Sequence, residues 1–447
     1  MLASSPEIIK LRESNGVNNV TKKPEYEDPG YRALVEENVK DAEVDIFVHD
    51  NMTSAIPATW GVRYGAKNLY MAEGGLTSVE GARKIIEALS RRDAVACLIL
   101  RHNELGDEGC VKLFEYLCSE GGQRHKVAGI LLNANCLGNV ALKSVGDFLR
   151  DNRWLRELYL ASNPFVGDSD IINSFAEALN SSSLEALSLS SCYSLSDAFA
   201  ERFFSCLDSP HLSNLQLSTI GLTRTAVPRI IEYLSSVRSR RLMTLKLSGN
   251  NIGARGAAKI VRSVIQDNFN IVSLEMYGVR THQGGQDDTN DNSSSETSVT
   301  LHGATTGFEE GLRYVLTRNG LLRRHTHAAA FRLLRYSRSL LLEPRRANED
   351  ESNRIPFRIQ SLPTELQLNI LSLTVDTLST SQRIRIFQFA SDPTTLPAML
   401  PDLRRRQSEG VHEPSLLEKS SAPFTLSPRD ANRTQWLRAV GCDIYEP

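Results

Sequence analysis

Residues 154–167 read WLRELYLASNPFVG, and this stretch decides the fold. It follows the frame LxxLxLxxNxL, in which Leu158 and Leu160 alternate as in a half-buried strand and Asn163 comes directly after them. A helix would instead place its apolar residues three or four positions apart. The frame therefore predicts a short strand that turns abruptly into a loop.

The same frame returns along the chain, in units whose starting points lie 28 to 32 residues apart. Each strand is followed by a segment with apolar residues at helical spacing, such as residues 106–117 and 253–264. A unit of this size cannot bury its apolar face without neighbours, so the units must stack. The predicted units begin near Ala66, Val95, Val127, Leu155, Leu184, Leu212, Leu242 and Ile271.

The asparagine is the most specific part of the frame. A strand that ends abruptly leaves backbone N–H and C=O groups in the interior without partners, and a buried carboxamide both donates and accepts hydrogen bonds. We therefore expect a ladder of stacked asparagines. Its members are Asn103, Asn135, Asn163 and Asn250, while Gly74, Cys192, Ile220 and Val279 hold the position in the other units.

This pattern resembles the leucine-rich repeat in its longer, ribonuclease-inhibitor-like form. The resemblance implies an α/β solenoid of about eight repeats over residues 66–281, with a parallel sheet on the concave side of a curved horseshoe and α-helices on the convex side. A mostly helical C-terminal region is expected to follow. Stacks of this kind curve because helices are wider than strands.

The segments around the array differ in composition from the repeats. We expect residues 1–65 to form a disordered start and an N-terminal cap, since a terminal repeat otherwise exposes its core. Residues 282–307 consist mainly of Gly, Gln, Asp, Asn, Ser and Thr, and are predicted to form a disordered acidic loop. Residues 343–360 are predicted to form a linker, and residues 401–447 a mostly flexible tail with a short helix at 434–440.

Residues 308–342 are predicted to form a helical C-terminal cap that is rich in arginine. The arginines favour either a surface for acidic partners or RNA, or a solvated outer face of the cap. Aromatic residues suited to base stacking are sparse here, which favours the second interpretation. The arginines are Arg313, Arg318, Arg323, Arg324, Arg332, Arg335 and Arg338.

Residues 361–373 read SLPTELQLNILSL and open a helical segment that we expect to span residues 361–400. Pro363 suits the first turn of a helix, and Leu366, Ile370 and Leu373 share one of its faces. The stretch resembles the opening of an F-box, which implies docking through residues 361–373 to a Skp-type adaptor of a cullin-type ubiquitin ligase. The resemblance covers about a dozen residues, and a plain capped amphipathic helix is the alternative. The matching residues are Leu362, Pro363, Glu365, Leu366, Ile370 and Leu371.

The composition of the chain limits which classes of function are expected. The net charge is −2, so no global field attracts nucleic acid, and binding of nucleic acid is not expected. Glu7 and Lys10 interrupt any secretory signal, and residues 94–100 form the longest apolar run, against the roughly 18 residues that a membrane span needs. The seven cysteines fall mostly at core positions, which favours a reducing compartment, cytoplasmic or nuclear. Common enzyme signatures do not occur, so no catalytic residue, cofactor, metal site or small-molecule substrate is predicted.

The repeat register predicts a binding face. The residue between the second and third leucines of each frame projects from the concave sheet, and the first four such residues are large and apolar. A row of large exposed apolar side chains near an arginine is typical of a protein interface, although sideways packing on the sheet is the alternative. The predicted protein-binding residues are Tyr70, Ile99, Arg101, Leu131, Asn133, Arg156 and Tyr159.

Two functions follow. The first is a non-catalytic scaffold that binds a protein partner on its concave face and, through the F-box resemblance, acts as a substrate adaptor of a cullin-type ubiquitin ligase. The second is a regulator of a small GTPase, because repeats with Asn-x-hydrophobic-Gly and a following Gly-Ala helix also resemble Ran GTPase-activating proteins and NOD-like receptor arrays. The long acidic tail of the former and the nucleotide-binding loop of the latter are missing.

Overall fold

The computed structural model of the chain describes residues 67–277, 300–341, 362–395 and 428–447. The predicted N-terminal cap at residues 1–65 and the predicted linker at 343–360 lie outside these ranges. Residues 278–299 and 396–427 also lie outside them, and they include most of the predicted acidic loop and part of the predicted tail.

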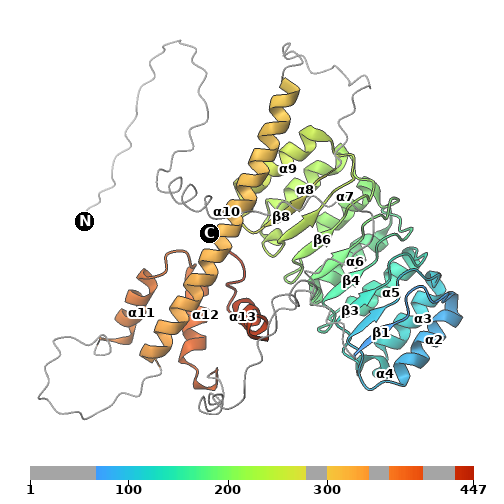
Figure 1. Cartoon of the computed structure of the whole chain (residues 1–447), viewed down its shortest axis with the longest axis horizontal. Coiled ribbons are helices and arrows are strands. Elements are labelled where there is room, and N and C mark those ends of the chain that lie inside the picture. Colours follow the sequence, from blue (N-terminus) through green and yellow to red (C-terminus); the bar gives the residue numbers. More distant parts are fainter. Residues whose placement is uncertain (1–66, 278–299, 342–361, 396–427) are drawn as a thin grey trace, which may run out of the picture. The chain divides into compact units, whose positions relative to one another are not determined.

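The repeats form one eight-stranded parallel sheet in which each strand pairs with the next in sequence (Figure 1). The central residues of neighbouring strands are in register, as in Leu98, Ile130 and Leu158, and these side chains are fully buried. The strands are β1 (Asn68–Tyr70), β2 (Cys97–Ile99), β3 (Gly129–Leu131), β4 (Glu157–Tyr159), β5 (Ala186–Ser188), β6 (Asn214–Gln216), β7 (Thr244–Lys246) and β8 (Ser273–Glu275).

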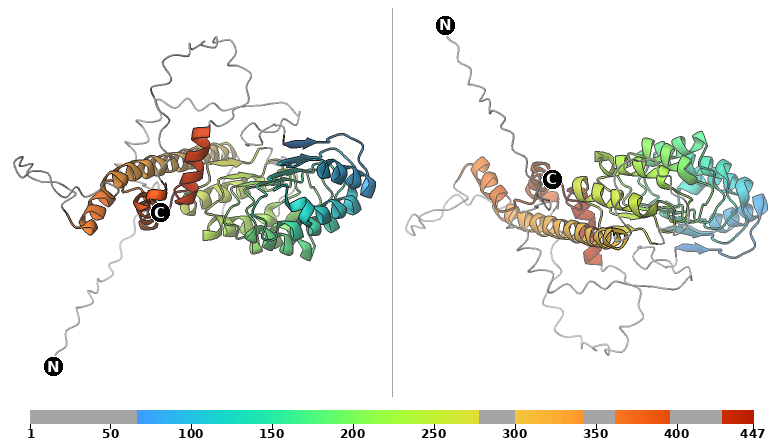
Figure 2. Two further views of the ribbon diagram at one scale, coloured as in Figure 1. Left: turned by 90° about the horizontal axis from the view of Figure 1, so that it is seen from below. Right: turned by 90° about the horizontal axis from the view of Figure 1, so that it is seen from above.

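A helix follows each of the first seven strands, and these helices lie on one side of the sheet (Figures 1 and 2). Their apolar faces, including Ile85, Leu113 and Val145, are fully buried against the leucines of the strands. The predicted α/β solenoid is therefore confirmed. The helices are α2 (Ser78–Ser90), α3 (Gly106–Cys118), α4 (Glu120–Gln123), α5 (Asn139–Leu149), α6 (Asp170–Ser181), α7 (Ser196–Cys206), α8 (Val227–Leu234) and α9 (Gly253–Asp267).

Asn163 joins two repeats through its buried side chain. Its Oδ1 accepts hydrogen bonds from the backbone N–H groups of Asn135 at 3.0 Å and Leu137 at 3.1 Å, in the loop of the preceding repeat. Its Nδ2 donates to the carbonyls of Leu132 at 3.1 Å and Leu160 at 2.8 Å. One carboxamide thus satisfies backbone groups of two successive turns, which is the role that the sequence pattern predicts for it.

Other ladder positions repeat this arrangement with variations. Asn103 and Asn250 make the same set of bonds with the repeats that precede them. Cys192 substitutes weakly, because its Sγ accepts from the N–H of Asn163 at 3.5 Å. Asn135 donates through Nδ2, but its buried Oδ1 has no hydrogen-bond partner among the described residues. The ladder is therefore complete at Asn103, Asn163 and Asn250 and weaker at Asn135 and Cys192.

Neighbouring repeats also cap one another's helices. The Oδ1 atom of Asp107, in the first turn of α3, accepts from the N–H groups of Gly138 at 2.6 Å and Ala141 at 3.1 Å, at the start of α5. A carboxylate at a helix N-terminus satisfies free N–H groups and complements the helix dipole. Gly167 permits close approach between repeats, because a Cβ there would overlap the carbonyl oxygen of Leu195.

The last repeat is covered by a long helix, α10 (Thr300–Leu341), which packs against α9 (Figures 1 and 2). Val315 of α10 is fully buried in the core of the array. The prediction of a loop over residues 282–307 is wrong for residues 300–307, which are helical. Helix propagation is cooperative, so a helix that is anchored by packing extends into polar sequence at little further cost.

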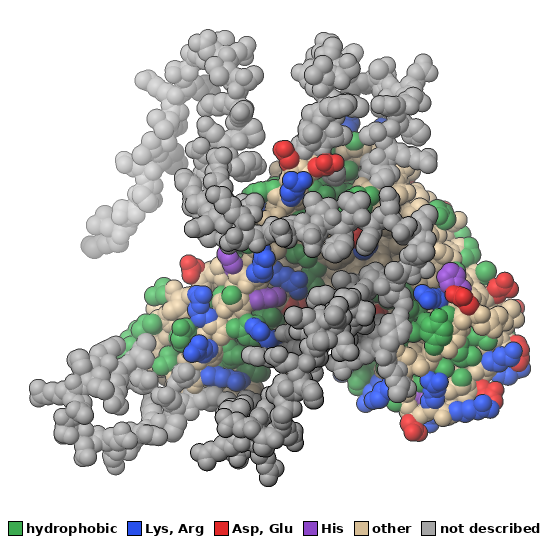
Figure 3. All heavy atoms as spheres, in the orientation of Figure 1, with side chains coloured by type: hydrophobic (Ala, Val, Ile, Leu, Met, Phe, Trp, Pro, Cys, Tyr) green, Lys and Arg blue, Asp and Glu red, His purple; other side chains and the backbone are tan. Residues whose placement is uncertain are grey.

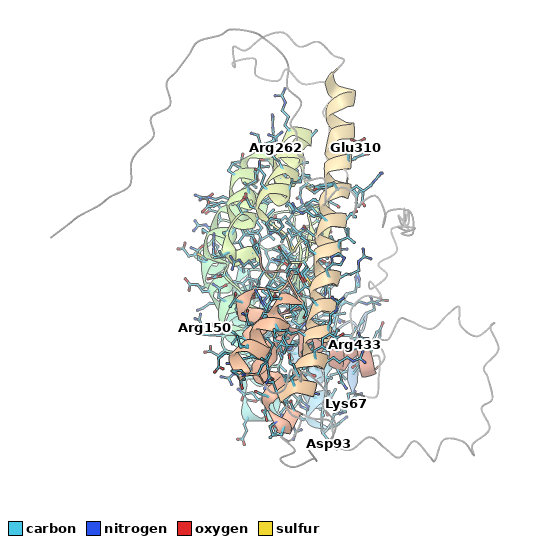
Figure 4. All side chains as sticks on the ribbon, turned by 90° about the vertical axis from the view of Figure 1, so that its left-hand side faces the viewer. Lys67, Asp93, Arg150, Arg262, Glu310 and Arg433 are labelled. Carbon is cyan, nitrogen blue, oxygen red and sulfur yellow. The ribbon has the colours of Figure 1, made fainter. Side chains whose placement is uncertain are left out.

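Beyond the array, a second apolar core joins α10 to α11 (Thr364–Leu373), α12 (Thr380–Ser391) and α13 (Pro428–Ala439). Figure 4 shows Arg433 of α13 beside α10, and its guanidinium lies 4.6 Å from the ring centre of Phe331. The short helix predicted at residues 434–440 of the tail overlaps α13, and Leu437, Val440 and Cys442 are buried in this second core. The residues that they pack against, on α10, α11 and α12, are far away in the sequence, so no local pattern predicts these contacts.

We predict that Asn163→Leu lowers the free energy of unfolding by about 1–3 kcal/mol, because the buried backbone groups that Asn163 satisfies lose their partner. Thermal melting measures this effect. The matched control is Asn251→Leu at an exposed position of a later repeat, which should change the midpoint little. Equal melting temperatures for the wild type and Asn163→Leu would contradict the structural role of the ladder.

Candidate protein-binding site

The predicted face of the sheet is in register from end to end. Tyr70 is paired with Ile99, Ile99 with Leu131, and Leu131 with Tyr159. The row continues through Ser188, Gln216, Lys246 and Glu275, and the last two form an ion pair at 2.8 Å. The structure therefore brings the predicted apolar residues together on adjacent strands.

The predicted exposure of this row is wrong for three of its four apolar members. Tyr70 is 57% exposed, but Ile99, Leu131 and Tyr159 are 1%, 4% and 8% exposed in the complete chain. Adjacent strands lie about 4.8 Å apart, so side chains in register shield one another sideways. Of the apolar row, only Tyr70 offers a large accessible surface.

The polar members of the predicted patch are half-buried and partly engaged within the chain. The Oδ1 of Asn133 accepts from the N–H of Ala161 at 3.0 Å. Arg156 donates to the carbonyl of Ser183 at 2.8 Å and lies 3.6 Å from a carboxylate oxygen of Glu185. Arg101 has a buried Nε with no hydrogen-bond partner among the described residues. Tyr70 and Arg101 are therefore the members best suited to meet a partner.

Several polar atoms on strands β4 and β6 are buried without a partner in the described part of the chain. The hydroxyl of Tyr159, the Oε2 of Glu157 and both amide atoms of Asn214 are buried and have no hydrogen-bond partner within the described ranges. Burial and, to a smaller extent, the nearby Glu185 carboxylate together raise the pKa of the Glu157 carboxyl to about 7. The sequence did not indicate that Glu157 and Asn214 are buried, because both read as ordinary polar strand residues.

The arginines of α10 are divided between structural and exposed positions. Arg318 is buried and donates to the carbonyls of Val264 at 3.2 Å and Asn268 at 2.9 Å, at the C-terminal end of α9. The neighbouring side chain of Asn319 is fully buried and donates to the carbonyls of Asn268 and Ile271. These two residues satisfy backbone groups that a further repeat would otherwise satisfy. Arg318 thus belongs neither to a solvated outer face of the cap nor to a surface for acidic partners or RNA, which were the two predicted alternatives.

Other arginines of α10 remain at the surface. Arg324, Arg332 and Arg335 are exposed, whereas Arg338 donates to Thr395 and lies 5.1 Å from the ring centre of Phe389. Figure 3 shows Lys and Arg side chains gathered around α10 and the helices beside it, with fewer acids on the face shown.

A different apolar surface is open on α11. Leu366, Ile370 and Leu373 are 48%, 38% and 78% exposed and occupy one face of the helix, as their spacing predicts. Of the other F-box-like residues, Pro363 is the N-cap, Glu365 is exposed, Leu362 is half-buried and Leu371 is buried. Ile384 of α12 is also exposed, and no sequence pattern had indicated it.

Known proteins resemble the repeats. A profile of the family described as Leucine Rich repeat matches residues 96–114, 151–172 and 239–261. Ribonuclease inhibitor from Sus scrofa is 31% identical over 177 residues, which cover 38% of this chain and 36% of that protein. The chain thus spans about a third of the length of this relative. A solved structure of the actin-binding site 2 of leiomodin-1 is 16% identical, with a TM-score of 0.26, over 37% of this chain and 82% of that one.

The repeat region is therefore a leucine-rich repeat solenoid. Its repeats are of the ribonuclease-inhibitor type, as the sequence predicted. All seven cysteines are free thiols. Among the described residues no group of His, Cys, Asp and Glu side chains is arranged to hold a metal ion, and no described helix has the length and apolar character of a membrane span.

We predict that buried Arg318 contributes strongly to stability, because its guanidinium satisfies carbonyls at the end of α9. Arg318→Ala should lower the free energy of unfolding by about 2–3 kcal/mol, as expected for the loss of charge-assisted buried hydrogen bonds. Chemical denaturation measures the change. Arg324→Ala, at an exposed position of the same helix, is the control and should stay within about 0.5 kcal/mol of the wild type. Equal losses in both variants would refute the capping role.

Glu157 should make stability depend on pH. Its folded pKa of about 7 lies above the ordinary value of 4.5, so the folded state holds the proton more tightly than the unfolded state. Its contribution to stability is present below about pH 4.5 and is lost as the pH rises through 7. We predict that Glu157→Gln flattens the fall in melting temperature between pH 5 and pH 8, whereas Glu104→Gln at an exposed position does not. Identical pH profiles for the two variants would contradict this assignment.

Proposed function

We propose that this protein is a non-catalytic scaffold that docks a Skp-type adaptor on α11 and holds a second protein on its repeats. The observation that carries the proposal is the exposed apolar face formed by Leu366, Ile370 and Leu373. Three large side chains at positions i, i+4 and i+7 of one helix form a contiguous apolar surface, and such surfaces mark interaction sites.

The opposite face of α11 supports this interpretation, because it anchors the helix. Leu371 is buried in the second core together with Val375 and Ile386. The side chain of Gln367 donates to the carbonyl of Leu362 at 2.8 Å and fastens the chain ahead of the helix. A helix that is already folded and anchored loses little conformational freedom when it binds, so its open face is preorganised.

The identity of the adaptor comes from the F-box resemblance of residues 361–373. A groove in a helical partner recognises apolar side chains at helical spacing, and the exposed residues of α11 have that spacing. The adjoining helix adds to the surface, since Arg383 of α12 donates to the carbonyl of Ser372 and its neighbour Ile384 is exposed. These contacts support a two-helix docking surface.

The repeats supply the second surface of the proposed scaffold. Tyr70 of β1 is exposed, and Arg101 follows β2, the next strand of the sheet. Aromatic residues and arginines are enriched among the residues that dominate binding energy at interfaces. We therefore place the partner's contacts around Tyr70 and Arg101, rather than along the buried part of the row at Ile99, Leu131 and Tyr159.

We predict that the purified chain binds a Skp-type adaptor and that Leu366→Asp with Leu373→Asp weakens the complex at least about 30-fold, or roughly 2 kcal/mol. Charged groups on the apolar face would be desolvated without partners. Isothermal titration calorimetry measures the affinity, and thermal melting verifies the fold. The control is Val237→Asp, because Val237 is similarly exposed but lies in the repeat array.

Absence of binding by the wild type at tens of micromolar would overturn the adaptor assignment, as would equal affinities for the wild type and the double variant. Capture of a small GTPase in its triphosphate form, unaffected by the α11 substitutions, would instead favour the alternative of a GTPase regulator.

A further inference from the structure

Residues 440–446, which we name the closing segment, are tied to the edge of the repeat sheet. Asp443 accepts two hydrogen bonds from Arg241, ahead of β7, at 2.6 and 2.7 Å. The backbone of Tyr445 pairs with the side-chain amide of Asn270, ahead of β8, with one bond at 2.9 Å and one at 3.1 Å. The segment thus contacts the residues that precede the last two strands, and its partner Arg241 lies 202 residues before Asp443 in the sequence.

The other side of the closing segment is tied to α12. Gln382 is fully buried and donates to the carbonyls of Gly441 at 2.8 Å and Ile444 at 3.0 Å. Arg385 donates to the carbonyl of Val440 at 2.8 Å. Gly441 has a φ of +68°, in the left-handed region that favours glycine, and its Cα faces the guanidinium of Arg385. Between these ties, Cys442 is fully buried in the second core.

The end of the closing segment is held by a single carboxylate. The Oε2 of Glu446 accepts from the hydroxyls of Ser379 at 2.5 Å and Ser381 at 2.6 Å, and its Oε1 lies 2.9 Å from Arg385. Burial acts to raise the pKa of Glu446, but the hydrogen bonds from the two serines and Arg385 outweigh burial and lower it. The carboxylate is therefore charged, and it depends on three donors at the start of α12.

We propose that Ser381 is a phosphorylation site and that a phosphate on it releases the closing segment. Ser381 is exposed, so a protein kinase has access to its hydroxyl. Ser379 is half-buried and serves as the N-cap of α12, accepting from the N–H of Gln382, which makes it the poorer substrate. A modification at Ser381 thus reaches Glu446 without removing the helix cap.

The charges explain the release. A serine/threonine kinase transfers the γ-phosphoryl group of a nucleoside triphosphate to the Ser381 oxygen, while the nucleoside diphosphate leaves and the hydroxyl proton is lost. The donor hydroxyl becomes a phosphate of charge about −1.5 to −2 next to the Glu446 carboxylate. Arg385 lies four residues after Ser381 on α12, so the phosphate competes for it within the helix. A phosphate near a helix N-terminus is favourable, so α12 remains intact while Glu446 is repelled.

The test is the reactivity of Cys442 in the full chain with phosphoserine installed at position 381. A thiol-alkylating reagent and site-resolved mass spectrometry give the rate at Cys442, and the fully buried Cys110 of the array core serves as an internal reference. We expect at least tenfold faster alkylation at Cys442 and less than a twofold change at Cys110. Ser381→Ala, which keeps Ser379 and Arg385 as donors, should accelerate Cys442 less than threefold.

Two further variants distinguish an electrostatic effect of the phosphate from a general destabilisation of the fold. Phosphoserine at Ser391, at the other end of α12 and exposed, should leave Cys442 within twofold of the unmodified protein. Glu446→Lys should open the segment, because Lys would face Arg385, and phosphoserine at 381 in that variant should restore protection to within threefold of the wild type.

Protection of Cys442 that stays within twofold after phosphorylation at 381 would overturn the proposal. Equal acceleration by Ser381→Ala and phosphoserine would show that the hydroxyl is only structural. Failure of the Glu446→Lys rescue would refute the electrostatic mechanism. Phosphopeptide mapping of the protein from phosphatase-inhibited cells should find phosphate on Ser381, and its absence there would also overturn the assignment.

Discussion

Each strand of the array is only three residues long, and the backbone groups at its end must find partners in a dry interior. The buried carboxamide at the ladder position satisfies them, and it does so across the boundary between repeats. Asn163 is bound to Asn135 and Leu137 of the preceding repeat and to Leu160 of its own. Because unpaired buried backbone groups are costly, this bond set fixes the spacing of the repeats and the register of the sheet. The Asp107 contact with the start of α5 adds a second tie on the helix side.

An array built in this way has an unsatisfied end, since its last repeat has no successor. The α10 helix resolves this through Arg318 and Asn319, which reach the carbonyls after α9. The arginine-rich composition of the helix is thus partly a consequence of capping. Guanidinium groups suit the task because several N–H donors on one side chain meet several helix-terminal carbonyls. Of the arginines outside this contact, Arg338 binds Thr395 and Arg323 donates to the carbonyl of Asp443, whereas Arg324 and Arg332 are exposed.

The two candidate surfaces differ in how their apolar residues are disposed. On the sheet, Ile99 and Leu131 lie side by side and are buried, and the neighbouring polar atoms of Glu157 and Asn214 are buried with them. On α11, the second core holds one face of the helix and leaves Leu366 and Leu373 exposed on the other. The helical region at the C-terminal side therefore has an open apolar face on α11, and the closing segment ties that region to the sheet.

The amino-acid sequence by itself determined the repeat class, the register of the strands and the role of Asn163, because all three depend on local periodicity and on the chemistry of one side chain. It also placed Leu366, Ile370 and Leu373 on one helix face. Only the tertiary structure decided which faces are open. Tyr159 and Tyr70 occupy equivalent positions in the frame, yet one is buried and the other exposed. The ion pair between Asp443 and Arg241 likewise could not be predicted from the sequence. Burial and ion pairing depend on contacts between segments that are far apart in the chain, and a local sequence pattern cannot predict those contacts.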